Sequence, residues 1–359
     1  MDKMVYNISK ELGVVEGSPW QLQDITESIT THQVTPGLLT ALLNPKKIYN
    51  MTDTFRYDAL DYTQQLPVGK GYSMRGEANL TTDKPYQKHF AIPSFGLMFN
   101  ALPKDWAGMR RFGTSNEVKT EADVIAELQM KANKAWTLFT EIGMAQLLTE
   151  DSNYIASGPF TEYDFYEDIT GGSRGSAVAM ELDDDTANHM AIMREEVDKL
   201  RDECEKAGVT YTGFDCICGN TTFNQRVLVE ENTGLAREMR QSLDIASEEI
   251  PMSSFNTPGS FQYANFVGAR DGIRYINYGA GITGTPMIGD TEAYLIPRGA
   301  DFMQLVYAPA QTRSYVNTQA LEAYSWTKTD EFKGVSVFQE KNILFFNPRP
   351  KLVRVLSNT

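Results

Sequence analysis

Apolar and polar residues follow each other along the chain with a period that changes from segment to segment. Beyond residue 120 the apolar positions recur at steps of three and four, the period of one helical face; they are Val124, Leu128, Ala132, Ala135, Phe139, Ile142 and Ala145. Thr120 is a suitable N-cap, and Glu121 and Asp123 place negative charge where a helix N-terminus favours it. The pattern predicts one helix over about 120–150, roughly 45 Å long at about 1.5 Å per residue.

The second half of the chain mixes helical and strand-like patterns. A second amphipathic helix is predicted over about 188–207, and Gly208 suits a left-handed C-cap. The apolar run 211–218 predicts a buried strand, and short β-type runs predominate from residue 261 onward. The polar turn at 340–342 is expected to join two of these runs as a hairpin. The fold class is therefore α+β.

The N-terminal part of the chain has weaker patterns. Residues 1–52 read as an extended arm that contains one short helix at 38–43. Residues 53–92 have strand-like ends around a turn-rich centre, with too few apolar residues for a hairpin that is stable by itself. Because open strand edges need a partner, we expect this hairpin to lie on a neighbouring molecule. The expected contact residues are Tyr62, Leu66, Val68, Tyr72 and Met74.

Composition narrows the class of protein. The chain has 359 residues, 42% of them hydrophobic, which is typical of a folded protein of about two domain-sized units. Its 33 basic and 47 acidic residues give a net charge of −14, which disfavours a nucleic-acid-reading role that depends on phosphate neutralisation. No signal-peptide pattern and no membrane-spanning apolar stretch is present, and three cysteines make no disulfide framework. We therefore expect synthesis in the cytosol and no membrane partner.

Three motifs contain residues that could form a chemical site. Two of them are explained more simply by local structure. Gly279–Gly284 reads G-x-G-x-x-G, but a strand and not a helix is expected after it, so it is interpreted as a turn and not as a dinucleotide site. Cys216 and Cys218 are too close in sequence for usual zinc spacing and are expected to be thiols on a buried strand. Neither a cofactor nor a resident metal is predicted.

The third motif is an acidic cluster, Glu181 with Asp183, Asp184 and Asp185. Carboxylates of this kind can hold a divalent cation or act as general acid and base, so a metal-dependent hydrolase is one alternative function. The other interpretation is a solvated loop that leads into the negative-favouring N-terminus of a helix. The three histidines lie far apart and no Ser-His-Asp arrangement is recognisable, so no catalytic residue is predicted and the chain is expected not to be an enzyme.

The order of elements (arm, long hairpin, long helix, α/β centre and β-rich end) resembles the lambda-like major capsid protein E family of tailed bacteriophages. The resemblance covers most of residues 35–359 in order. It is carried by the segments Thr35–Leu39 and Phe55–Asp58, Lys84–Lys88, Arg110–Arg111 with the helix that follows, Leu295–Gly299, Ala323–Ser325 and Asn347–Val353.

The resemblance implies the Hong Kong 97 capsid fold. Its expected parts are an N-terminal arm (1–52), an extended loop (53–92), a peripheral domain with the spine helix (93–187 and 330–359) and an axial α/β domain (188–329). Copies of the chain would form hexamers and pentamers of an icosahedral head shell around double-stranded DNA that is bound without sequence specificity. Portal, scaffold and decoration proteins are the further partners implied, with assembly in the host bacterial cytoplasm and the virion as the final location. Another multimeric phage component, such as a tail or connector protein, is the second alternative.

Overall fold

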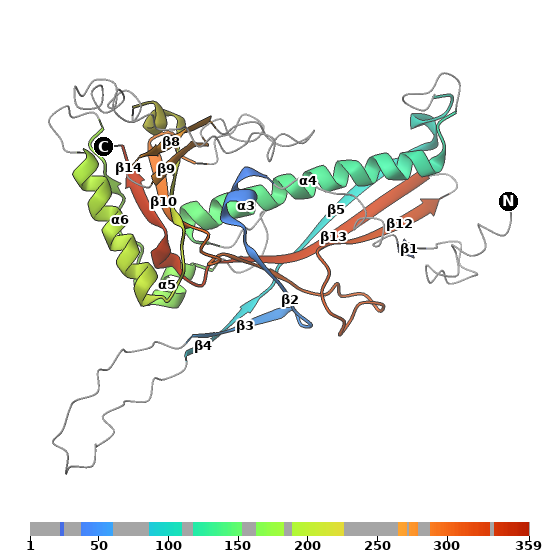
Figure 1. The fold of residues 1–359 in the computed structure, drawn as a ribbon. Helices are drawn as coiled ribbons and strands as arrows, with labels where there is room; N and C mark the ends of the chain where they lie inside the picture. The colour runs from blue at the N-terminus through green and yellow to red at the C-terminus, as the bar shows by residue number, and fades with distance from the viewer. Residues whose placement is uncertain are drawn as a thin grey trace, which may run out of the picture.

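The computed structural model describes residues 22–24, 37–59, 86–109, 118–152, 163–182, 189–225, 265–270, 273–278, 288–330 and 334–358. These residues form two six-stranded sheets and one two-stranded sheet, with helices packed against them. The molecule is elongated along its longest helix, α4, which runs above the first sheet towards the second (Figure 1).

Helix α4 (Glu121–Glu150) confirms the predicted long helix and its cap. The Asp123 backbone N–H donates to Thr120 Oγ1, and the Thr120 N–H donates to the Asp123 carboxylate, so each residue caps the other. Val124, Leu128, Ala132 and Ala145 of the predicted stripe are buried. Phe139 and Ile142 are half-buried, and Phe139 packs on Phe95 and Phe345 of the first sheet. Four further residues of α4 outside the predicted stripe are also buried: Trp136, Met144, Leu147 and Leu148.

The first sheet lies under α4 and is built around β13. Its strand order is β1-β12-β13-β11-β2, with β5 also paired to β13. The strands are β1 (Leu22–Asp24), β2 (Lys46–Tyr49), β5 (Ser94–Ala101), β11 (Gln304–Tyr307), β12 (Tyr324–Asp330) and β13 (Gly334–Phe346). All these pairings are antiparallel except that of β2 with β11.

The predicted hairpin turn at 340–342 is wrong, because β13 runs through these residues as one strand of 13 residues. Lys341 and Asn342 look like turn residues, but both are buried and hydrogen-bonded. Lys341 Nζ donates to Thr140 Oγ1 on α4, and Asn342 Nδ2 donates to the Pro309 carbonyl. These partners, distant in sequence, satisfy polar groups that would otherwise favour a solvated turn.

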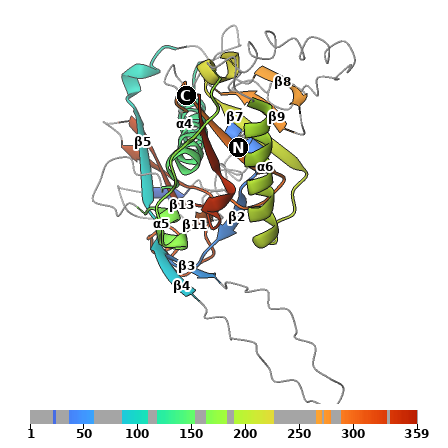
Figure 2. The same cartoon turned by 90° about the vertical axis from the view of Figure 1, so that its left-hand side faces the viewer.

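The second sheet has the strand order β6-β14-β10-β7-β9-β8 and lies beside α6 (His189–Lys206), as Figure 2 shows from the side. Its strands are β6 (Val178–Ala179), β7 (Gly213–Cys218), β8 (Asn265–Arg270), β9 (Ile273–Asn277), β10 (Glu292–Arg298) and β14 (Arg354–Ser357). The predicted second helix and the predicted buried strand are confirmed as α6 and β7. Gly208 has φ +63°, as a left-handed C-cap requires.

The expected hairpin of residues 53–92 is confirmed at its base. Strands β3 (Thr54–Ala59) and β4 (Tyr86–Ala91) pair antiparallel and project from the body of the molecule (Figures 1 and 2). Residues 60–85 lie outside the described residues. The predicted short helix is confirmed as α3 (Leu38–Leu43), and shorter elements are α5 (Phe165–Thr170), η1 (Pro103–Asp105) and η2 (Pro350–Leu352).

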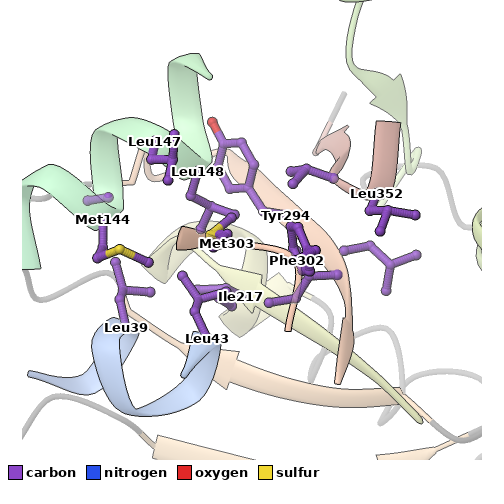
Figure 3. Packing of buried hydrophobic residues seen from close by; sticks show 14 of the residues in the cluster. Leu39, Leu43, Met144, Leu147, Leu148, Ile217, Tyr294, Phe302, Met303 and Leu352 are labelled. Atoms are coloured by element: carbon purple, nitrogen blue, oxygen red, sulfur yellow. The ribbon is translucent and has the colours of Figure 1, made fainter. Parts of the chain in front are cut away.

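The main hydrophobic core lies where α3, the C-terminal half of α4 and both sheets meet. Figure 3 shows side chains of α3, α4, the second sheet, η2 and the segment before β11 converging. They include Leu39, Leu43, Met144, Leu147, Leu148, Ile217, Tyr294, Phe302, Met303 and Leu352. One core therefore joins segments from the beginning, middle and end of the chain, which fixes the base of the hairpin relative to both sheets.

The crossing of α4 over β13 depends on Gly143, and Gly143→Ala tests it. An added Cβ would overlap the ring of Phe345 on β13. Alanine favours a helix by about 1 kcal/mol over glycine, but overpacking typically costs about 1–3 kcal/mol. We expect a net loss of unfolding free energy in a denaturant titration.

Lys134→Ala on the exposed side of the same helix is the matched control, and its expected change stays within about 0.5 kcal/mol. A Gly143→Ala variant as stable as wild type would contradict the close packing of α4 on β13.

Candidate assembly surface

The stem of the projecting hairpin has two open edges. Strands β3 and β4 pair with each other, and within the described ranges no third strand lies beside either of them. The register places Phe55 opposite Phe90 and Arg56 opposite His89. Open edges of this kind are templates for pairing with another chain, so the stem is a candidate assembly element.

The base of the stem is anchored in a cluster of aromatic side chains. Phe55 and Phe90 are buried and contact Phe346 at the end of β13, with ring centroids 5.2 and 5.3 Å apart. Phe165 of α5 contacts Phe90 and Phe346 at 5.6 and 5.2 Å. Burying rings of this size gives the largest stabilisation available to so short a hairpin. The stem is thus stable because of the core below it and not because of its own two strands.

Polar contacts fix the direction in which the stem leaves the body. The Ala91 N–H donates to the Tyr163 hydroxyl at 3.0 Å, and Lys88 Nζ lies 2.6 Å from the Asp168 carboxylate. The Tyr57 hydroxyl donates to the Pro348 carbonyl at 3.3 Å. A partly exposed ion pair is worth at most about 1 kcal/mol, so these contacts orient a stem that the aromatic cluster holds.

The first sheet also has an open edge. Among the described residues β5 pairs with β13 and with no other strand. Along β5 exposed and half-buried side chains alternate, and Met98 on the exposed face is 56% exposed. A large apolar side chain on an edge strand is a feature of protein–protein contacts.

The expected contact residues Tyr62, Leu66, Val68, Tyr72 and Met74 lie outside the described residues, so their role stays a prediction. The same holds for the glycine motif 279–284 and for Asp183, Asp184 and Asp185 of the acidic cluster. Glu181 is described, and it is exposed at φ +51° before the undescribed part of the cluster.

The cysteines occupy the positions predicted for core thiols. Cys216 and Cys218 are buried on β7 with their Sγ atoms 3.6 Å apart, and Cys204 is buried on α6. Over the described ranges no group of three or more His, Cys, Asp or Glu residues is placed to hold a metal ion. No helix in the described part of the chain is both long and apolar enough to cross a lipid bilayer.

Sequence reasoning missed the buried carboxylate of Glu141, which joins three parts of the molecule. Its Oε1 accepts the Leu39 N–H at 2.6 Å and the Tyr278 hydroxyl at 2.9 Å. Its Oε2 accepts the N–H and the hydroxyl of Thr40 at 3.2 and 3.0 Å. Burial raises the pKa of Glu141 above its ordinary value, although all four donors act in the opposite direction.

Glu141 replaces the missing N-cap of α3. The N-cap residue of α3 is Gly37, which has no side chain to accept the free N–H groups of the first turn. The carboxylate of α4 accepts two of them and also holds Tyr278, which follows β9 in the second sheet. A signal was present in the sequence, because position 141 lies four residues before Ala145 on the predicted apolar face.

Replacement of Glu141 is expected to separate α3 from α4. In Glu141→Ala two backbone N–H groups lose their acceptor, at about 1–3 kcal/mol each, so we expect unfolding free energy to fall by roughly 3–5 kcal/mol. Glu141→Gln keeps one acceptor oxygen and should cost less. Chemical denaturation followed by circular dichroism measures both variants.

Tyr278→Phe is the control, because it removes one hydrogen-bond donor to Glu141 and leaves the α3 cap in place. Its unfolding free energy is expected to fall by about 1 kcal/mol. Equal stability of Glu141→Ala and Tyr278→Phe would contradict the capping role.

Comparison with known proteins gives one family match. A sequence profile described as phage major capsid protein E matches residues 21–356. No curated protein sequence matches the chain.

Two solved structures show the likeness of fold. The putative capsid protein of a prophage of Escherichia coli CFT073 has a TM-score of 0.58 at 10% identity, over 93% of this chain and 99% of that chain. The capsid of cyanophage Pam1 has a TM-score of 0.50 at 11% identity, over 91% and 94%. The predicted α+β fold of the Hong Kong 97 type is confirmed.

Proposed function

We propose how this chain, which belongs to the phage major capsid protein E family, contacts its neighbours in a shell. The chain is a major capsid protein, a structural subunit that forms an icosahedral phage head together with copies of itself and is part of the virion. In our proposal the hairpin 53–92 crosses onto a neighbouring copy and adds its backbone to an open sheet edge there. The observation that carries it is a stem anchored by four buried aromatic rings and open at both edges.

The edge strand β5 of the neighbour is the receiving edge in this proposal. It is open on one side among the described residues and offers Met98 as an exposed apolar contact. Strand addition supplies backbone hydrogen bonds, and alternate side chains of the added strand enter pockets. The contact residues of the added hairpin would be Tyr62, Leu66, Val68, Tyr72 and Met74. A weak contact of this kind becomes strong when a closed shell repeats it many times.

Finer features of the assembly belong to the same proposal. Hexamers and pentamers are the expected intermediate rings, and portal, scaffold and decoration proteins are the expected partners. The DNA inside is enclosed without sequence-specific binding, which the net charge of −14 supports. Assembly takes place in the host cytoplasm, and the subunit catalyses no reaction.

The division into domains is also proposed. The peripheral part comprises 93–187 and 330–359, and the axial part 188–329, with the arm (1–52) and the extended loop (53–92) outside both. In the structure the chain crosses from the second sheet to the first between β10 and β11 and returns between β13 and β14. The first crossing lies within the proposed axial part and the second within the proposed peripheral part. Neither a tail or connector role nor a hydrolase built on Glu181 is favoured by a specific observation.

Deletion of residues 60–85, with a short Gly-Ser linker joining β3 to β4, tests the role of the hairpin. Because Phe55 and Phe90 keep their places in the core, we expect a folded subunit with a cooperative thermal transition. We expect no closed shells, because the part that crosses to the neighbour is missing. Negative-stain electron microscopy and light scattering measure assembly on the same sample.

A full-length variant with the five contact residues changed to serine separates the effect of side chains from that of chain length. At equal subunit concentration, this variant should form at least tenfold fewer closed shells than wild type. Shells of normal number and size from the deletion would contradict the proposal.

A further inference from the structure

A cavity of about 660 Å³ lies between α3, α4, β2, β11 and the segment 319–323, and Trp136 of α4 forms part of its wall. Much of its wall is apolar or aromatic, including Trp136, Leu305 and Tyr307. A cavity of this volume is large enough for several side chains of another molecule.

A buried ammonium group forms part of the wall. Lys341 on β13 is only 7% exposed, and its Nζ donates to Thr140 Oγ1 at 3.0 Å. The same Nζ lies 6.0 Å from the ring centre of Trp136 and 5.9 Å from that of Tyr307. Buried charges in proteins are normally paired, yet in the part of the chain that the structure describes no ion pair joins Lys341 to a carboxylate.

The carboxylate on the cavity wall is engaged elsewhere. Glu322 Oε1 lies 2.7 Å from Lys47 Nζ and accepts the Tyr49 hydroxyl at 2.8 Å. Burial lowers the pKa of Lys341 to about 8; the charge of Glu322 raises this pKa and that of Lys47 lowers it. The charge of Glu322 thus offsets only part of the free-energy cost of burying the Lys341 ammonium group.

Two exposed apolar side chains lie on the cavity wall beside the Lys47–Glu322 ion pair. Tyr49 is 38% exposed and Leu321 is 37% exposed. The two segments that carry them adjoin, because the Ala320 N–H donates to the Asn50 carbonyl at 2.9 Å. Apolar contacts around a desolvated polar point are the usual arrangement of a protein–protein hot spot.

We propose that this cavity receives an acidic side chain from a second copy of the chain, whose carboxylate pairs with Lys341. The proposal rests on the shell-forming function, which places copies of the chain against each other. With 47 acidic and 33 basic residues, a neighbouring copy carries more acidic than basic groups, which complements a buried cation. Tyr49 and Leu321 would then be covered by the residues that flank the acidic side chain.

The pairing gives Lys341 opposite effects on the free subunit and on the shell. In the free subunit the charge is buried without an ion partner, so Lys341→Met should leave the subunit as stable as wild type or more stable. In the shell the same change should remove an ion pair and lower the denaturant midpoint for dissociation. Lys134→Met, with the same charge change on an exposed helix position, is the control and should alter neither.

The pH dependence of the free subunit follows from the same group. Its folded pKa of about 8 lies below the ordinary lysine value of about 10.4, so between these values the unfolded chain binds more protons. Wild type should therefore gain stability relative to Lys341→Met as pH rises from 8 to 10. Burial raises the pKa of Tyr49 to about 12 and that of Tyr307 well above 10, so both phenols stay neutral in this range.

Zero-length cross-linking identifies the occupant. Subunits labelled with ¹⁵N and unlabelled subunits are mixed before assembly, and the shells are treated with a carbodiimide, which joins a lysine amine to a carboxylate in contact with it. Peptide mass spectrometry should find Lys341 joined to an acidic peptide in mixed-isotope pairs. Lys47 and Glu322, 2.7 Å apart within one chain, are the built-in positive control and should give same-isotope pairs.

Each other result overturns the proposal. Same-isotope pairs at Lys341 would place the carboxylate in its own chain, and no cross-link at Lys341 beside a normal Lys47–Glu322 product would leave the cavity without an acidic occupant. Shells of Lys341→Met as resistant to denaturant as wild type would exclude a stabilising pair. Absence of shells would contradict the assembly function itself, whereas shells without the mixed pair contradict this proposal alone.

Discussion

The buried carboxylate of Glu141 is the constraint on which the arrangement of the subunit depends. Its two oxygens bind the first turn of α3, the hydroxyl of Thr40 and the hydroxyl of Tyr278. Desolvation of a carboxylate is costly, and only several donors in the right places offset it. The N-terminal helix, the spine helix and the second sheet must therefore assume one relative position for this charge to be buried. The main hydrophobic core forms around the same junction. The packing of apolar side chains and the hydrogen bonds of Glu141 therefore favour the same arrangement of these elements.

A fixed junction gives the projecting hairpin a fixed direction. The aromatic cluster at the hairpin base includes Phe346, the last residue of β13, and β13 lies under α4 along much of its length. The base of the hairpin thus belongs to the same rigid body as the spine helix. A subunit in a closed shell must meet its neighbours at defined angles, and an element anchored in the core can set such angles. An element tied only by exposed ion pairs could not, since each contributes too little free energy.

The sequence allowed prediction of elements whose stability is local. The capped helix α4 and the buried strand β7 each have a period or a cap that can be read from consecutive residues. The short helix α3 was predicted from its apolar run, although its cap comes from Glu141 on α4. The continuous strand β13 could not be predicted in this way, because Lys341 and Asn342 find their partners on α4 and beside Pro309. Glu141 was missed for the same reason, since its four donors come from residues about 100 or more positions away. Pairing between distant residues decides these positions, and no local pattern records it.

Glu141 on α4 and Lys341 on β13 are buried charges on facing elements, and their electrostatic environments differ. Because of this difference, we assign the interactions of Glu141 to folding and those of Lys341 to assembly. Glu141 is satisfied within the chain, so its interactions form when the subunit folds. Lys341 lies on the strand beneath the same helix and has a hydroxyl and two aromatic rings around it, which stabilise an ammonium group less than a carboxylate does. Evolution removes an unpaired buried charge easily, by one substitution to an apolar residue. A charge that weakens the free subunit is consistent with selection when a contact made only in the shell offsets its cost. The free energy of that contact then favours the assembled state without stabilising the subunit beforehand.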